Sequence, residues 1–371
     1  MTTAAVPDNS FINDIRESGE FKSITFSGYK NTEVKKQLID SLLRGKVEPA
    51  CYWCAEMVCA GHFLDIWECI LFYLGKHIHS ANPKIVIYLQ KRYTIFRNII
   101  DQGHFISILE LRNNATIRQL FSEIIIILVY SPKKQSFETL KIDKVEEFDI
   151  TCMTDRLKAP NISYMGEILD KEDPKELMIV VNEFAYHISE DGRNMHSAVF
   201  WIEWIIEFEH ICKKRNEPAR CKRRAYQVEN KFQTDIIWIF WDAILAQAKH
   251  LGVFIENLEL GLLELFCIKY TTATSKKRKY LLYYAIELLT EPIATNIELI
   301  DASKKNCIAF INEKIHLIYK QIKKNECSPN TDYLFMGSDG KESFTNSIRK
   351  LEMMNNMDFL PRNNSDTNNI G

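Results

Sequence analysis

Four side chains of the kinds that bind zinc lie close together in the amino-terminal part of the chain: Cys51, Cys54, Cys59 and His62. Their spacing resembles that of a small zinc knuckle. On a single helix, however, Cys51 and His62 are about 16 Å apart along the axis, whereas zinc ligands lie about 2.0–2.3 Å from the metal. Apolar residues such as Trp53 separate them, as in a packed helix. We therefore predict buried cysteines with no metal or cofactor, and keep these four residues as the alternative metal ligands.

Other chemistry-bearing patterns are incomplete. His77 and His79 place two imidazoles close together, but the sequence nearby supplies no third ligand, and we predict a structural role for both. The sequence has no phosphate-binding Gly-x-x-x-x-Gly-Lys-Ser/Thr loop, no Gly-x-Gly-x-x-Gly, no His-Glu-x-x-His and no Gly-x-Ser-x-Gly. These observations favour a non-enzymatic protein. An enzyme built from scattered Glu, His and Cys side chains stays open as an alternative.

Two basic clusters could bind an anionic partner. The candidate residues are Lys213, Lys214, Arg215, Arg220, Lys222, Arg223 and Arg224 in the first cluster, and Lys276, Lys277, Arg278 and Lys279 in the second. If they face the same way, they could neutralise phosphates of a nucleic acid or carboxylates of an acidic protein. Basic residues at a helix end also complement the helix dipole and need no partner. A localisation signal is a further reading of such clusters.

Helices must position these groups, and two Trp-x-x-Trp pairs indicate which helices are central. Trp201 and Trp204 share one face of a predicted amphipathic helix, with Glu203 on the opposite face. Trp238 and Trp241 lie in a run that is apolar nearly all round, which predicts a helix packed on several sides. The 37-residue interval between the pairs suggests a helical repeat, but the residues around them do not match, so we predict irregular packing.

The sequence as a whole predicts a mainly all-α protein with two irregular helical lobes. We expect a flexible arm at 1–25, an N-terminal helical lobe at 26–130, a mixed linker at 131–172, a C-terminal helical lobe at 173–325 and a flexible polar tail at 326–371. Asp173-Pro174-Lys175-Glu176 has the cap, proline and carboxylate of a helix start. Further helices are predicted at 31–43, 84–100, 116–130, 192–215, 218–250, 253–270, 277–290 and 297–324.

Bulk composition excludes several classes of protein. Of 371 residues, 46% are hydrophobic and 26% charged, which suffices for a sizeable core, and the net charge of -2 gives no general attraction to nucleic acid or an anionic membrane. No apolar run approaches the roughly 20 residues of a membrane span. Ten cysteines in a chain of this length, and no secretory signal after Met1, lead us to expect intracellular synthesis.

Several short stretches resemble helical proteins of nucleocytoplasmic large DNA viruses. They are Tyr52-Trp-Cys-Ala-Glu-Met57, Trp67-Glu68, Lys76-His-Ile-His-Ser-Ala-Asn-Pro-Lys84 and Phe200-Trp-Ile-Glu-Trp-Ile-Ile-Glu-Phe-Glu209. The resemblance implies a minor capsid or virion-assembly protein that contacts other subunits, such as capsid proteins, in the virion or the cytoplasmic virus factory. No catalytic residues are carried over. The alternative is a nucleic-acid-binding accessory factor of viral replication or transcription.

Overall fold

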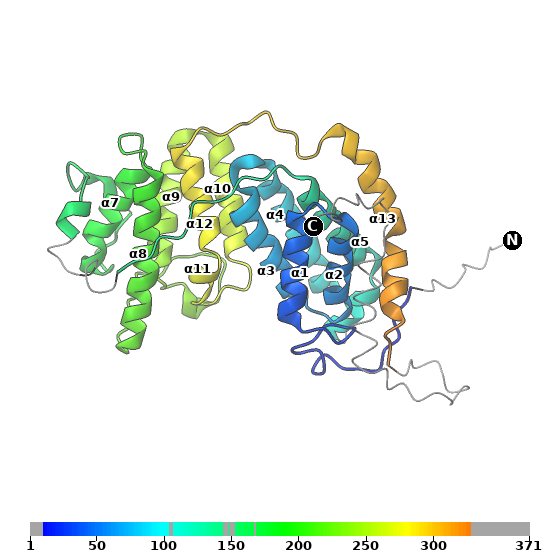
Figure 1. Cartoon of the computed structure of the whole chain (residues 1–371). Coiled ribbons are helices and arrows are strands. Elements are labelled where there is room, and N and C mark those ends of the chain that lie inside the picture. Colours follow the sequence, from blue (N-terminus) through cyan, green and yellow to red (C-terminus); the bar gives the residue numbers. More distant parts are fainter. Residues whose placement is uncertain (1–9, 104–106, 144–147, 149–152, 167, 328–371) are drawn as a thin grey trace, which may run out of the picture. The chain divides into compact units, whose positions relative to one another are not determined.

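The computed structural model describes residues 10–103, 107–143, 148, 153–166 and 168–327, and its regular secondary structure is helical (Figure 1). Over these residues no β-strand forms, and the only β-type pairings are the isolated bridges Ile24 with Lys30 and Arg220 with Asp235. The prediction of a mainly all-α protein is confirmed. The predicted tail from 328 onward and the arm at 1–9 lie outside the described residues.

The chain divides into two compact units. Unit 1 comprises the described residues of Met1–Cys69, Ile99–Tyr130 and Ala302–Gly371, and unit 2 those of Ile70–Asn98 and Ser131–Asp301. These units differ from the contiguous lobes predicted from the sequence, and the predicted linker at 131–172 belongs to unit 2. The helix at 302–323 belongs with the amino-terminal helices, and most of the helix at 84–102 belongs to unit 2.

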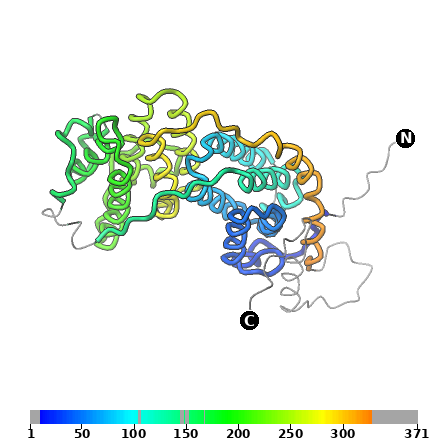
Figure 2. The backbone as a smooth tube through the Cα atoms, turned by 45° about the horizontal axis from the view of Figure 1, so that its top comes forward, coloured from blue at the N-terminus to red at the C-terminus, as the bar shows by residue number. Residues whose placement is uncertain are grey.

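Unit 1 is built on helix α2. Its helices are α1 (Asn31–Leu43), α2 (Val47–Cys59), the start of α3 (Phe63–Tyr73), the end of α4 (Lys84–Gln102), η3 (Ile108–Asn113), α5 (Ala115–Tyr130) and α13 (Ala302–Lys323). Helices α1, α5 and α13 all pack on α2, and both views show α13 beside α5 (Figures 1 and 2). The isoleucine-rich run of α5 is a buried helix, as predicted, because apolar neighbours cover it on several sides.

The predicted flexible arm is partly wrong. Ile12 and Phe21 are buried in unit 1. The side chain of Arg118 donates to the hydroxyl of Ser10 (2.9 Å), and the Asp14 carboxylate accepts from the backbone N–H of Cys327 (2.8 Å). Residues 10–25 are thus fixed by contacts with residues far along the chain, which a local pattern cannot reveal.

Unit 2 contains both tryptophan helices. It holds the rest of α3 and α4, η1 (Leu74–Ile78), η2 (His79–Ala81), η4 (Thr154–Arg156), η5 (Ser163–Met165), η6 (Lys175–Leu177), α7 (Met178–Ile188), α8 (Met195–Lys214), η7 (Asn230–Phe232), α9 (Ile237–Leu251), α10 (Val253–Phe266), α11 (Thr274–Lys277) and α12 (Lys279–Thr290). Trp201 on α8 and Trp238 and Trp241 on α9 are buried. Trp238 also donates its indole N–H to the carbonyl of Phe232 (2.7 Å), so the largest apolar side chains and a satisfied polar group anchor this core.

Local sequence explains several helix boundaries in unit 2. Asn194 caps α8 by accepting from the backbone N–H of Ser197 (2.9 Å), and Gly252, with a φ of 103°, separates α9 from α10. Gly75 lies in the π-helix η1, where a Cβ atom would come within 2.8 Å of the Tyr280 backbone. Only glycine permits this close approach of η1 to α12.

Three predictions from the sequence are wrong because contacts with residues distant in the sequence override the local pattern. The expected helix at 218–250 begins only at Ile237, because residues 218–236 form a hairpin with Cys221 N–H bonded to the Thr234 carbonyl (2.9 Å). Asp173 does not cap a helix but binds Arg224. Glu203 is buried, not on a solvated face, because it accepts from the Tyr283 hydroxyl and pairs with Lys279 (2.8 Å).

Candidate functional site

Most cations of the first basic cluster are engaged inside unit 2. Arg224 binds both oxygens of Asp173 (2.6 and 2.7 Å) and one of Asp242 (2.9 Å). Lys222 pairs with Asp170 (2.6 Å). This use of charge fixes the hairpin at 218–236 to neighbouring segments, so Arg224 in particular has little capacity left for a partner.

The remaining cations of this cluster differ in their availability. Arg223 donates to the side-chain oxygens of Gln233 (2.6 Å) and Asn230 (2.9 Å). Lys214 and Arg215, at the end of α8, are exposed and make no side-chain hydrogen bond or ion pair among the described residues. They are the two members of the cluster most open to a partner.

The second basic cluster is split in the same way. Arg278 is buried and donates to the carbonyl of Phe266 (2.6 Å), where it satisfies the end of α10. Lys279 is bound to Glu203. Lys276 and Lys277 are exposed. Of the eleven basic residues that the sequence analysis singled out, Lys214, Arg215, Lys276 and Lys277 are exposed without a side-chain hydrogen bond or ion pair to another described residue.

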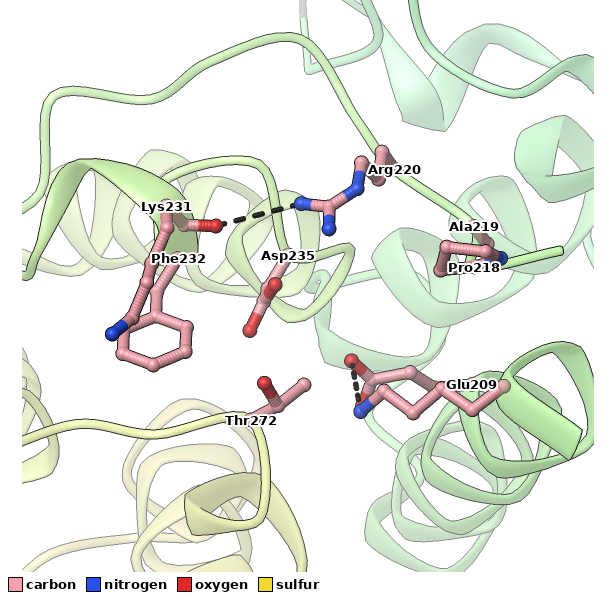
Figure 3. A pocket seen from close by; sticks show the side chains of 9 residues that line it. Glu209, Pro218, Ala219, Arg220, Lys231, Phe232, Asp235 and Thr272 are labelled. Atoms are coloured by element: carbon pink, nitrogen blue, oxygen red, sulfur yellow. Dashed lines mark hydrogen bonds and ion pairs between the residues drawn. The ribbon is translucent and has the colours of Figure 1, made fainter. Parts of the chain in front are cut away.

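A cavity of about 160 Å³ lies between the end of α8, the hairpin, η7 and the loop before α11 (Figure 3). Its lining residues are Glu209, Lys213, Pro218, Ala219, Arg220, Lys231, Phe232, Asp235 and Thr272. Because Lys213 and Thr272 line the same cavity, the segments that carry the two basic clusters meet here. The cavity brings part of the predicted basic set together around a hollow.

Two buried carboxyl groups form the acidic side of this cavity. Burial raises the pKa of Glu209 to about 7; the charge of Lys213, 3.2 Å away, lowers it and that of Asp235 raises it further. Burial also raises the pKa of Asp235, although the hydroxyl of Tyr270 donates to it (3.1 Å) and nearby cations favour its ionised form. Glu209 can therefore exchange a proton near neutral pH.

Sequence reasoning missed both carboxyl groups. Glu209 lies eight residues after Trp201 and four after Ile205, which places it at the edge of the apolar face of α8. This position was the sequence signal that could have indicated a buried carboxyl group. Asp235 had no such signal, because its surroundings come from the hairpin and from Tyr270. The lining side chains include two carboxyl groups and three cations, which suit ionic binding and proton exchange.

The alternative zinc ligands lie apart from this cavity, in unit 1. Cys51, Cys54 and Cys59 are buried on α2, where burial raises the pKa of Cys51 to about 12 and the pKa values of the other two thiols well above their ordinary range. His62 faces the Ile24 carbonyl (2.9 Å). Within the described ranges, no group of three or more His, Cys, Asp or Glu side chains could hold a metal ion.

His79 is a buried structural residue, as expected from the sequence, but the carboxylate that it pairs with could not be foreseen. Its Nδ1 atom contacts the Glu287 carboxylate, and its ring stacks on Tyr284, with ring centroids 4.9 Å apart. Lys134 and Ser80 donate to the same carboxylate. This cluster joins η2, the segment after α5 and α12 within unit 2.

No helix among the described residues combines the length and the apolar character that crossing a membrane requires. Comparison of the chain with protein-family models, curated proteins and solved structures found no match.

Proposed function

We propose that the chain is a non-enzymatic structural protein that binds other protein subunits, most specifically a minor capsid or virion-assembly component of a large DNA virus. The observation that carries the protein-binding part is a set of exposed apolar side chains on α10, next to the polar Glu256 and Asn257. Val253 is 72% exposed, and Phe254 and Leu260 are also exposed. Val253 and Leu260 are separated by two helical turns and therefore lie on the same face. Apolar side chains surrounded by polar residues can form the centre of a protein interface, and we assign that role to these three.

Buried charged side chains that form hydrogen bonds inside each unit also support this proposal. In unit 1, Glu56 accepts from Ser27 and from Tyr52 (3.1 Å), and in unit 2 Asp173 accepts from Arg224. Glu56 thus holds a loop against α2, and Asp173 holds the segment before η6 against the hairpin, which is what a rigid docking body needs. The virion assignment rests on the sequence resemblance, and it places the protein in the virion or the virus factory.

Quantitative mass spectrometry of purified virions tests the assignment. We expect copies of this chain in fixed proportion to the major capsid protein. Leu260→Asp should lower its incorporation at least tenfold. Leu43→Asp is the matched control, because Leu43 on α1 and Leu260 are both 41% exposed. Detection only in infected-cell extract, or equal loss with both variants, would contradict the proposal.

A nucleic-acid-binding accessory factor is the second candidate, favoured by the exposed cations Lys214, Arg215, Lys276 and Lys277 on segments that meet at one cavity. If these residues contact phosphates, charge reversal at Lys214 and Arg215 should weaken DNA binding and reduce its dependence on salt. A filter-binding titration at several salt concentrations measures both. Unchanged affinity and salt slope would reject this candidate.

A further inference from the structure

In the cavity beside α8, the acidic side chains are buried and the basic side chains are exposed. Glu209 and Asp235 are 7% and 6% exposed, and both line the cavity. Figure 3 shows the carboxylate of Asp235 pointing into the same space as that of Glu209. Asp235 accepts one hydrogen bond from Tyr270, which leaves acceptor capacity on the cavity side. The deep part of the cavity is therefore acidic.

The outer part of the cavity is basic. Lys213, Arg220 and Lys231 are exposed and line its rim. Lys213 pairs with Glu209 (3.2 Å) and Lys231 with Glu229 (2.7 Å), so Arg220 is the rim cation without a carboxylate partner among the described residues. Arg220 donates to the Thr234 hydroxyl (2.8 Å) and to the carbonyl of Lys231 (3.4 Å), which are neutral acceptors. Figure 3 shows the bond to Lys231. The positive charge of Arg220 is thus not consumed by a hydrogen-bonded carboxylate, and its guanidinium keeps donors for an anionic group.

The cavity also has an apolar wall and a size suited to a small molecule. Phe232, Pro218 and Ala219 line it between the charged groups. Its volume of about 160 Å³ is close to that of a cavity which holds benzene, about 150 Å³ on a comparable scale. A ligand with a short aliphatic chain would match this space and this wall.

We propose that this cavity binds a small zwitterion, an amino acid whose ammonium and carboxylate groups are joined by a short aliphatic chain. The ammonium group binds Asp235 and Glu209, and the carboxylate binds Arg220 and Lys213. A simple anion would meet the two buried acids, and a simple cation would meet the basic rim. A ligand that carries both charges satisfies both ends.

Isothermal titration calorimetry of the full chain tests this proposal, with glycine, β-alanine and 4-aminobutanoate as probes and acetate and methylammonium as single-charge controls. We expect saturable binding of at least one amino acid, at least tenfold tighter than either control. Asp235→Asn and Arg220→Gln should each weaken it at least tenfold. Lys214→Gln, a change of an exposed neighbour that does not line the cavity, should leave it unchanged.

Circular dichroism establishes that each variant is folded. If Asp235→Asn unfolds the protein through loss of its contact with Tyr270, Glu209→Gln replaces it in the comparison. Absence of saturable binding for all three amino acids overturns the proposal. The proposal is also overturned if acetate binds as tightly as the amino acids and Asp235→Asn or Glu209→Gln leaves acetate binding unchanged. The rim would then hold an adventitious ion only.

Discussion

Replacement of Arg224 by Met tests whether the hairpin at 218–236 is held by ion pairing. The Asp173 side chain is only 1% exposed, and Arg224 donates to both of its oxygens. Met keeps the length and much of the packing of the side chain but removes its charge and donors. Removal of one partner from a buried pair costs about 3–5 kcal/mol, because the other charge stays buried. We expect Arg224→Met to lower the free energy of unfolding by about this amount.

Urea denaturation followed by tryptophan fluorescence and circular dichroism measures this loss. With a slope of about 3 kcal/mol per molar urea, the midpoint should fall by about 1–1.7 M. Lys222→Gln is the neighbouring control. Its ion pair with Asp170 is exposed to solvent, so the midpoint should stay the same within error.

The double variant Arg224→Met with Asp173→Asn distinguishes a buried charge from lost packing. Since it removes both charges, it should recover much of the stability that Arg224→Met loses. A loss below about 1 kcal/mol for Arg224→Met, or a double variant less stable than the single one, would refute the reasoning.

Acid should reduce the penalty of Arg224→Met. Burial alone raises the pKa of Asp173, but hydrogen bonds from Arg224 and from the backbone of Asp170 and Lys222 outweigh this effect and lower it below 3.8. A lowered pKa means that the ionised carboxylate stabilises the fold above its ordinary value, and that this contribution disappears as the pH falls through the lowered value. The gap between the wild type and Arg224→Met should therefore be largest at neutral pH.

Three further predictions concern the interior. Burial alone raises the pKa of Glu287, but contacts with His79, Lys134 and Ser80 lower it to about 2. The ionised carboxylate should therefore contribute about 3 kcal/mol to the free energy of unfolding, and this contribution should vanish as the pH falls from 4.5 to 2. A Glu287→Gln variant whose stability in urea titrations differs from the wild type by the same amount throughout this range would contradict this. Trp238→Ala should destabilise the fold by about 3–5 kcal/mol, measured by urea denaturation, and a loss below 1 kcal/mol would argue against a central position. Cys51, Cys54 and Cys59 should react with a thiol reagent only on unfolding, because burial raises their pKa values; rapid reaction of all three in the native protein, followed by absorbance, would count against this.

Much of the helical fold could be predicted from the sequence alone. The helix at 31–43 was predicted with its observed bounds, and the apolar run at 116–130 was recognised as a buried helix. Both follow from local periodicity, which depends only on residues one or two turns apart. The burial of Trp201 and Trp238 follows from the same periods. Such features survive because every neighbouring residue supports the same structure.

The tertiary structure decided what local periodicity could not express. The segment at 218–236 became a hairpin because Arg224 binds Asp173, 51 residues away in the sequence. Helix α13 joined unit 1 because its buried residues pack on α2 and α5. The candidate cavity exists because Glu209 and Asp235 are buried beside each other by segments that share no local pattern. Ion pairs and burial depend on distance in space, and distance in space between remote residues is fixed only when the whole chain has folded.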